Sequence, residues 1–351
     1  MKAIMCSMIF LPSLLWAQAD LPELDKALTT ESDSAIVSEN TELNGSEREN
    51  LESNSEASAD DGLDEPYAPE EPEVPESISK RARDANGLFQ QRENRETNTA
   101  NNPFVLTPHK PNYFLPFSYT SNPNDRAFLG DQAADSDELE SVEFKFQLSV
   151  KFPVAYDVVG RDSSLWFAYT QQAYWQAYNS TISSPFRDTN HEPEVFVVTK
   201  PKKGLLGIKP NYVTYGFNHQ SNGQSGDLSR SWNRFYVDFM FEHGDTAFSI
   251  KPWYRIPESS KVDDNPNIEN YYGYGEFNVI HVIDDYTIDV MLRNNFKSSD
   301  NRGAIQVGFT FPLWGKTRGY VQYFNGYGQS LLDYNHQTQS LGVGIMLTNW
   351  L

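Results

Sequence analysis

The chain has 351 residues, of which 38% are hydrophobic and 14% aromatic, and its formal net charge is −20. Its one cysteine, Cys6, lies in the N-terminal apolar run, so the mature protein is expected to lack both disulfides and a thiol nucleophile. No window holds the run of about 18 apolar residues that a transmembrane helix requires, which excludes helical membrane proteins.

Residues 1–19 have the pattern of a secretory signal peptide. One lysine precedes a short apolar run, and the small-residue site Ala17-Gln18-Ala19 follows it. We therefore expect cleavage after Ala19 and export of the mature chain.

Residues 20–104 are predicted to be a disordered acidic extension. Between residues 20 and 76 there are 19 Asp and Glu residues against Lys26 and Arg48. Such a segment, rich in Ser, Glu, Asn and Pro and poor in aromatics, cannot bury enough apolar surface to offset its chain entropy. The negative charge thus belongs to this tail, and no nucleic acid partner is expected. A partner-binding arm that uses the basic cluster at 80–83 is the alternative interpretation.

Residues 105–351 are dense in aromatic residues and divide into segments of about ten residues separated by Gly, Asn, Asp and Pro. This pattern predicts β-strands and an all-β domain. Twelve strands are expected, at 112–119, 141–152, 163–177, 193–200, 211–219, 231–242, 246–255, 270–281, 286–296, 303–313, 317–326 and 337–348.

Alternation in these segments fits two architectures. In 231–242, SWNRFYVDFMFE, one face is mostly apolar and the other carries Arg234, Asp238 and Glu242. A soluble sandwich would bury the apolar face, whereas a membrane barrel turns it to lipid. The export signal, the strand lengths and aromatic residues at strand ends favour a twelve-stranded antiparallel transmembrane β-barrel. The aromatic residues expected at the membrane interfaces are Tyr271, Tyr272, Tyr274, Tyr320, Tyr323 and Trp350.

The lengths of the connections predict the orientation of the barrel. Those after the sixth, eighth and tenth predicted strands are tight (EHGD, DD, LWGK), whereas several of the others are long. Short turns of outer-membrane barrels face the periplasm. The connection near residues 219–230 is therefore expected at the outer rim.

Three polar residues are predicted on the lipid-facing surface. Side chains two apart in a strand share a face, so His219 and Ser221 continue the outward row of Tyr215 and Phe217. A hairpin would bring Asn233 level with His219. A serine, a histidine base and an amide that orients the imidazole suit nucleophilic acyl transfer. The alternative is that they are polar side chains that contact water at the rim of the barrel and have no catalytic role.

Three stretches, "YTQQAYWQAYNSTISSPFRDTNHEPEVF", "NHQSNGQSGDLSRSWNRFY" and "KPWYRIPESSKVDDNPNIENYYGYGE", resemble the bacterial outer-membrane phospholipase A family. The resemblance covers about residues 102–351. It implies calcium-dependent hydrolysis of phospholipid acyl esters, of phospholipase A1/A2 and lysophospholipase type, in the outer leaflet of the outer membrane by a homodimer. It also implies that Ser221 is the nucleophile, His219 the base, Asn233 its orienter and Gly223 the oxyanion donor.

The resemblance further implies a Ca²⁺ site and a dimer face. The calcium ligands would be the Ser229 hydroxyl, the carbonyl of Gln224 and the carbonyl of Ser183 from the second subunit, although GQSGDLS departs from the usual spacing of an acidic residue. Gln171 matches a polar residue of the dimer face, and we expect it on an outward row with Trp166, Ala168 and Thr170. Tyr174 and Trp175 are expected either in an acyl-chain cleft or in the aromatic belt.

Two other functions remain possible from the residues alone. A non-enzymatic barrel for transport or structure would leave His219 and Ser221 incidental, but the large and charged inward row of Trp232, Arg234, Tyr236 and Asp238 would plug its interior. An adhesin would act through its outer loops, which are modest in length.

Overall fold

The computed structural model describes residues 84–100, 106–129, 138–204, 208–315 and 317–351. The expected signal peptide and most of the expected acidic extension lie outside these residues. The described residues belong to one compact unit, residues 70–351, which is all-β with a few short helices.

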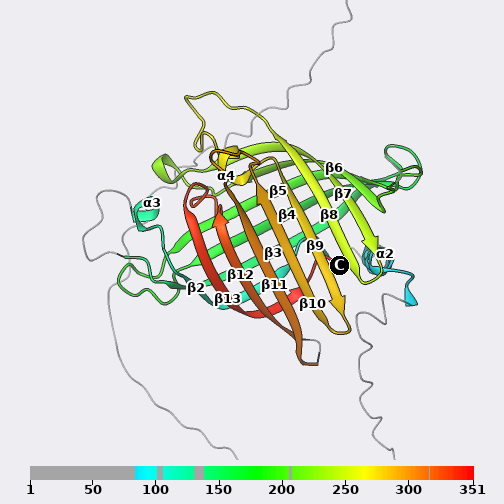
Figure 1. The fold of residues 1–351 in the computed structure, drawn as a ribbon, viewed down its shortest axis with the longest axis horizontal. Helices are drawn as coiled ribbons and strands as arrows, with labels where there is room; N and C mark the ends of the chain where they lie inside the picture. The colour runs from blue at the N-terminus through cyan, green and yellow to red at the C-terminus, as the bar shows by residue number, and fades with distance from the viewer. Residues whose placement is uncertain (1–83, 101–105, 130–137, 205–207, 316) are drawn as a thin grey trace, which may run out of the picture. The chain divides into compact units, whose positions relative to one another are not determined.

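A single antiparallel sheet closes into a barrel (Figure 1). Each strand from β2 to β13 pairs with the next one, β13 pairs with β2, and β1 adds two residues beside β3. The predicted twelve-stranded barrel is thereby confirmed. The strands are β1 (Thr107–Pro108), β2 (Asn112–Thr120), β3 (Val142–Tyr156), β4 (Ser163–Trp175), β5 (Phe186–Thr199), β6 (Tyr212–Ser221), β7 (Ser231–His243), β8 (Thr246–Arg255), β9 (Gly275–Ile283), β10 (Tyr286–Asn294), β11 (Gly303–Trp314), β12 (Thr317–Tyr327) and β13 (Gln337–Thr348).

Two strand boundaries differ clearly from the prediction. β5 begins at Phe186 instead of residue 193, because its first half is polar and lacks the apolar signal of a strand. β9 begins at Gly275 instead of residue 270, because the short helix α4 (Glu269–Tyr272) precedes it. Gly273 follows the last residue of α4 as its C-cap, and its φ of 74° favours glycine.

The exterior of the barrel is apolar, as the alternation predicts. Along β7 the side chains of Trp232, Arg234, Tyr236 and Asp238 are buried, whereas Phe235 between them is 55% exposed. An apolar surface of this extent is typical of a membrane-facing wall. Other exposed apolar residues in the strands are Phe117, Leu148, Phe152, Val195, Tyr215, Ile250, Ile288, Phe309 and Leu341.

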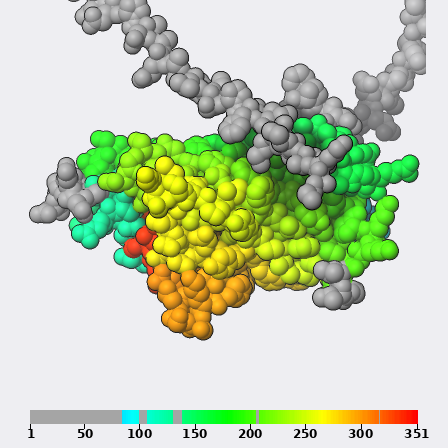
Figure 2. Space-filling view, turned by 90° about the horizontal axis from the view of Figure 1, so that it is seen from above, coloured from blue at the N-terminus to red at the C-terminus, as the bar shows by residue number. Residues whose placement is uncertain are grey.

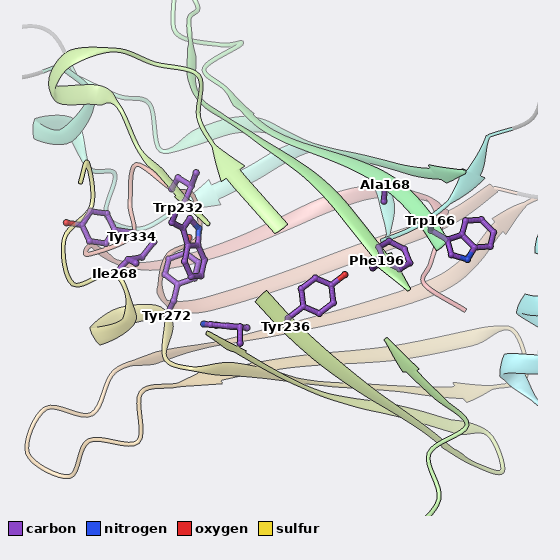
Figure 3. Packing of buried hydrophobic residues seen from close by; sticks show 10 residues of the cluster. Trp166, Ala168, Phe196, Trp232, Tyr236, Ile268, Tyr272 and Tyr334 are labelled. Atoms are coloured by element: carbon purple, nitrogen blue, oxygen red, sulfur yellow. The ribbon is translucent and has the colours of Figure 1, made fainter. Parts of the chain in front are cut away.

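The interior is filled by aromatic rings and ion pairs around a cavity of about 710 Å³. Trp232 packs edge-on against Trp253 and Tyr272, and Tyr236 lies between these rings and Phe196 (Figure 3).

A buried ion network adds to this interior. Arg187 of β5 donates to Glu143 of β3 at 3.0 and 3.1 Å and to Asp333, in the connection between β12 and β13, at 2.5 Å. Buried ion pairs tolerate loss of one partner poorly, because the other charge is then left unpaired. The network therefore ties distant strands to one arrangement.

Three of the aromatic residues expected at membrane interfaces lie elsewhere. Tyr272 and Tyr320 are buried inside the barrel, and Trp350 packs against Phe89 near the C-terminus. The prediction counted aromatic residues at strand ends without testing which face they occupy.

The two ends of the barrel differ, as the connection lengths predict. Two-residue turns join β7 to β8 and β9 to β10, and this end also holds the C-terminus and α2 (Figure 1). The opposite end carries α3 (Asp125–Leu129), α4 and most of the longer connections, whereas residues 200–204 and 208–211, between β5 and β6, lie at the end with the tight turns. There the 256–274 connection, yellow, adjoins the orange surface around residue 300 (Figure 2), and Asn295 Nδ2 donates to the Asn270 carbonyl at 2.7 Å.

Among the described residues, no helix has both the length and the apolar character needed to cross a membrane.

Helix α2 (Leu88–Ala100) corrects the prediction that the extension is disordered as far as residue 104. Its Phe89 ring packs edge-on against Tyr212, and Lys151 of β3 donates to Glu96 at 2.6 Å. The Phe89 N–H also donates to the Glu242 carboxylate at 2.7 Å. Composition suggested disorder because the helix has little apolar surface of its own, and its stability comes from these contacts with the barrel.

The Glu96 carboxylate should make the docking of α2 depend on pH. Burial alone would raise its pKa, but the charges of Arg92 and Lys151 outweigh burial and lower the pKa from 4.5 to about 2. A lowered pKa contributes stability that is complete above about pH 4.5 and is lost as the pH falls toward 2. We expect hydrogen-exchange protection of α2 to decline across that window. The Glu96→Gln variant should show reduced protection already at pH 6, and normal protection there would contradict the assignment.

Candidate active site

Strands β6 and β7 bring His219 and Asn233 together. The two residues are direct partners in the antiparallel register, and Ser221 is opposite Ser231. His219 Nδ1 and Asn233 Oδ1 are 2.9 Å apart. Since an amide oxygen can only accept, this contact requires the proton on Nδ1, which leaves a lone pair on Nε2.

These side chains lie on the outside of the barrel. Gln220 and Arg234, the neighbours of the site residues along each strand, line the interior cavity, whereas His219, Ser221 and Asn233 do not. The adjacent exterior pair, Phe217 and Phe235, packs with ring centroids 5.5 Å apart. A polar group is thus embedded at the edge of an apolar wall.

Ser221 ends β6 beside a backbone donor. Its hydroxyl oxygen accepts from the N–H of Gly223 at 3.1 Å. Gly223 has a φ of 65°, a conformation that glycine adopts without the strain of a side chain. Among the described residues, Ser221 and His219 form no hydrogen bond with each other.

Asn222 organises the connection 222–230 that follows. Its buried side-chain oxygen accepts from the N–H groups of Gln224 and Arg230 at 3.3 and 2.9 Å, and its amide donates to the Leu228 carbonyl at 2.8 Å. The one side chain thereby satisfies three backbone groups and fixes the path of the loop next to Ser221.

The predicted calcium ligands supply hard oxygen atoms of the type that Ca²⁺ prefers. The Ser229 hydroxyl donates to Asp264 Oδ2 at 2.6 Å, so its lone pairs remain available beside a carboxylate. Gln224 is exposed in the same loop, and Ser183 lies in the separate β4–β5 connection with a φ of 61°. No group of three or more His, Cys, Asp or Glu side chains suited to a metal occurs within the described part of the chain. The donor set fits a site completed by carbonyls, hydroxyls and water.

Gln171 lies on the outer face of β4 as predicted, but the three residues predicted to share that face do not. Gln171 is half-buried and pairs with Leu148 and His191, outside the barrel. Trp166 and Thr170, expected on the same row, are buried inside, as is Ala168. Residues of even and odd number in a strand point to opposite faces, so Gln171 cannot share their row.

Tyr174 and Trp175 also occupy opposite faces. Tyr174 is fully buried inside the barrel and its hydroxyl donates to the Gln172 side chain at 2.9 Å, so both of its predicted locations are wrong. Trp175 is half-buried, stacks on Phe186 at 5.3 Å and donates from Nε1 to the Ser184 carbonyl at 2.9 Å. It therefore supports the connection that contains Ser183.

Three neighbours of the site, His191, Tyr169 and Glu258, were not found from the sequence. His191 of β5 is opposite Ser221, and its Nδ1 is 2.5 Å from the Tyr169 hydroxyl. Glu258 accepts from Asn233 Nδ2 at 3.2 Å. The pairing of β5 with β6 could have indicated His191, but nothing local in the sequence marks Glu258.

The fold and the site together define a class, a membrane β-barrel with a candidate nucleophile and base on its outer wall. The phospholipase A1 family model matches residues 89–347, and the chain belongs to that family. It is an enzyme of the outer membrane, and the predicted family is confirmed.

Related proteins agree in sequence and in structure. Phospholipase A1 of Escherichia coli K12 is 37% identical over 248 residues, which cover 71% of this chain and 83% of the relative. The Salmonella typhi outer membrane phospholipase, solved as a dimer with bound calcium, has a TM-score of 0.66 at 36% identity and covers 73% of this chain and 97% of its own. The E. coli enzyme with an asparagine-to-alanine change in its active site has a TM-score of 0.65 at 36% identity. The match covers 72% of this chain and 95% of that enzyme's chain.

Replacement of Asn222 should loosen the 222–230 connection. Asn222→Ala removes one donor and one shared acceptor from three part-buried or exposed backbone groups, and we expect it to lower the free energy of unfolding by about 1 kcal/mol. Hydrogen exchange in the loop should increase. Ser225→Ala, in the same loop and without a side-chain cap hydrogen bond, is the matched control and should change neither quantity.

Proposed function

We propose that this enzyme hydrolyses acyl ester bonds of phospholipids and lysophospholipids with Ser221, His219 and Asn233 as its triad. The observation that carries the proposal is the 2.9 Å contact between His219 and Asn233, beside Ser221, on the apolar outer wall. Membrane lipids approach a barrel from that side, so the ester of a phospholipid can reach the serine without leaving the bilayer.

The proposed reaction begins at the Ser221 hydroxyl. His219 Nε2 takes its proton while the oxygen attacks the ester carbonyl, and Asn233 holds the imidazole in the tautomer that this transfer needs. The Gly223 N–H, which now bonds to the serine oxygen, would turn to the developing oxyanion. His219 then returns its proton to the alcohol that leaves, and water releases the fatty acid in the second half of the cycle.

The proposed cofactor is Ca²⁺, held by the Ser229 hydroxyl, the Gln224 carbonyl and the Ser183 carbonyl of a second copy. When bound, it would supply positive charge near the oxyanion. The calcium-bound dimer of the Salmonella typhi relative and the oxygen donors at Ser229 support this assignment. Ligands divided between two copies would make dimerisation, metal binding and activity one coupled equilibrium.

We further propose that the site faces the outer leaflet and that the N-terminal extension lies in the periplasm. The site is at the end with most of the longer connections, and α2 is at the end with the tight turns. Gln171, on the exterior beside His191, is the proposed contact of the dimer face.

Substitution of the nucleophile tests the function directly. Ser221→Ala should reduce hydrolysis of a phospholipid in detergent by at least about a thousandfold, because no other group can form the acyl-enzyme. EDTA should abolish wild-type activity and added Ca²⁺ should restore it. Release of fatty acid measures both effects, with circular dichroism to establish that the barrel is folded. Full activity of Ser221→Ala would end the proposal.

The calcium assignment has its own test. Ser229→Ala removes a hydroxyl ligand, and we expect the Ca²⁺ concentration for half-maximal activity to rise roughly tenfold or more. The amount of crosslinked dimer at a fixed low Ca²⁺ concentration should fall in parallel. Ser225→Ala is the control in the same loop, and an unchanged calcium requirement in Ser229→Ala would remove Ser229 from the ligand set.

A further inference from the structure

Glu258 lies where the connection from β8 to β9 passes the beginning of β7. The N–H of Ile256 donates to the Asn233 carbonyl at 2.8 Å, so the chain is held beside Asn233 just after β8 ends. Pro257 follows and restricts the backbone at the next position. The loop therefore delivers the Glu258 side chain to Asn233 along a fixed path.

The carboxylate of Glu258 makes one polar contact among the described residues, and it is with Asn233. Glu258 Oε1 accepts from Asn233 Nδ2 at 3.2 Å, and the side chain is half-buried. The nearby cation Arg255 is paired with Asp263 and Glu269 at 2.7 and 3.1 Å instead. A carboxylate with no cationic partner there has little use in stabilising the loop, so its contact with Asn233 calls for another role.

The contact decides which way the amide of Asn233 points. The oxygen and nitrogen of an amide are nearly equal in size, and a half turn of the group exchanges them. A carboxylate accepts hydrogen bonds and cannot donate them, so Glu258 favours the NH₂ group on its side. The amide oxygen is then directed to His219 Nδ1, which keeps its proton, and Nε2 is free to act as the base.

We propose that Glu258 is a positioning residue that acts through Asn233, extending the triad to Ser221, His219, Asn233 and Glu258. This inference rests on the proposed function of the first three.

A double-mutant cycle tests this role. Glu258→Ala should lower kcat about tenfold with little change in KM, because substrate does not contact the carboxylate. Glu258→Gln, whose side-chain oxygen can still accept from Asn233, should recover most of that loss. In an Asn233→Ala background, Glu258→Ala should have no further effect, because the amide through which it acts is gone.

Controls separate this role from loop folding and from a failure of the triad. Glu140→Gln removes an equal charge from an exposed position at the same end of the barrel and should leave kcat unchanged. Full kcat in Glu258→Ala, or an equal loss with and without Asn233, would overturn the role of Glu258 while Ser221→Ala remained inactive. Activity in Ser221→Ala would instead overturn the proposed function itself.

Discussion

The structure depends on one constraint, that a closed antiparallel sheet gives each residue a fixed side of the wall. Closure satisfies the backbone hydrogen bonds within the barrel, so a strand can face lipid only with alternate side chains. Along β7 this places Trp232 and Arg234 inside and Phe235 outside. His219, Ser221 and Asn233 lie on the outer side, where a water-soluble esterase would have no reason to place them.

On the inner side of the wall, charged side chains are held in buried ion pairs. Arg187 joins Glu143 and Asp333, and Lys110 joins Glu192 and Glu194 at 2.8 and 2.5 Å. Burial raises the penalty for any unpaired member, so each network favours one arrangement of strands. The same network supports the strands of the outer site, because Arg234 of β7 pairs with Glu192 of β5 at 2.7 Å and Asn218 of β6 donates to that carboxylate at 2.8 Å.

The site itself combines rigid and adaptable parts. His219 and Asn233 belong to paired strands, whereas Gly223, the proposed oxyanion donor, and the proposed calcium ligands belong to connections. Hydrogen bonds from the side chains of Asn222 and Trp175 to backbone groups hold those connections in place. Placement on a strand pair would give precise geometry to the proposed proton transfer, and placement of the proposed metal ligands on separate connections would allow a second copy to complete the set.

The sequence by itself determined the barrel, its strand count and the side of the wall that each well-defined strand presents, because alternation is a local property with a period of two. It also pointed to His219, Ser221 and Asn233. It failed for the polar first half of β5, for the docked helix α2 and for the row assigned to Gln171. Only the tertiary structure decided that Glu258 meets Asn233, that His191 adjoins Ser221 and that Tyr174 is buried. These contacts join segments whose spacing follows from strand pairing and loop paths, and no local pattern of residues encodes them.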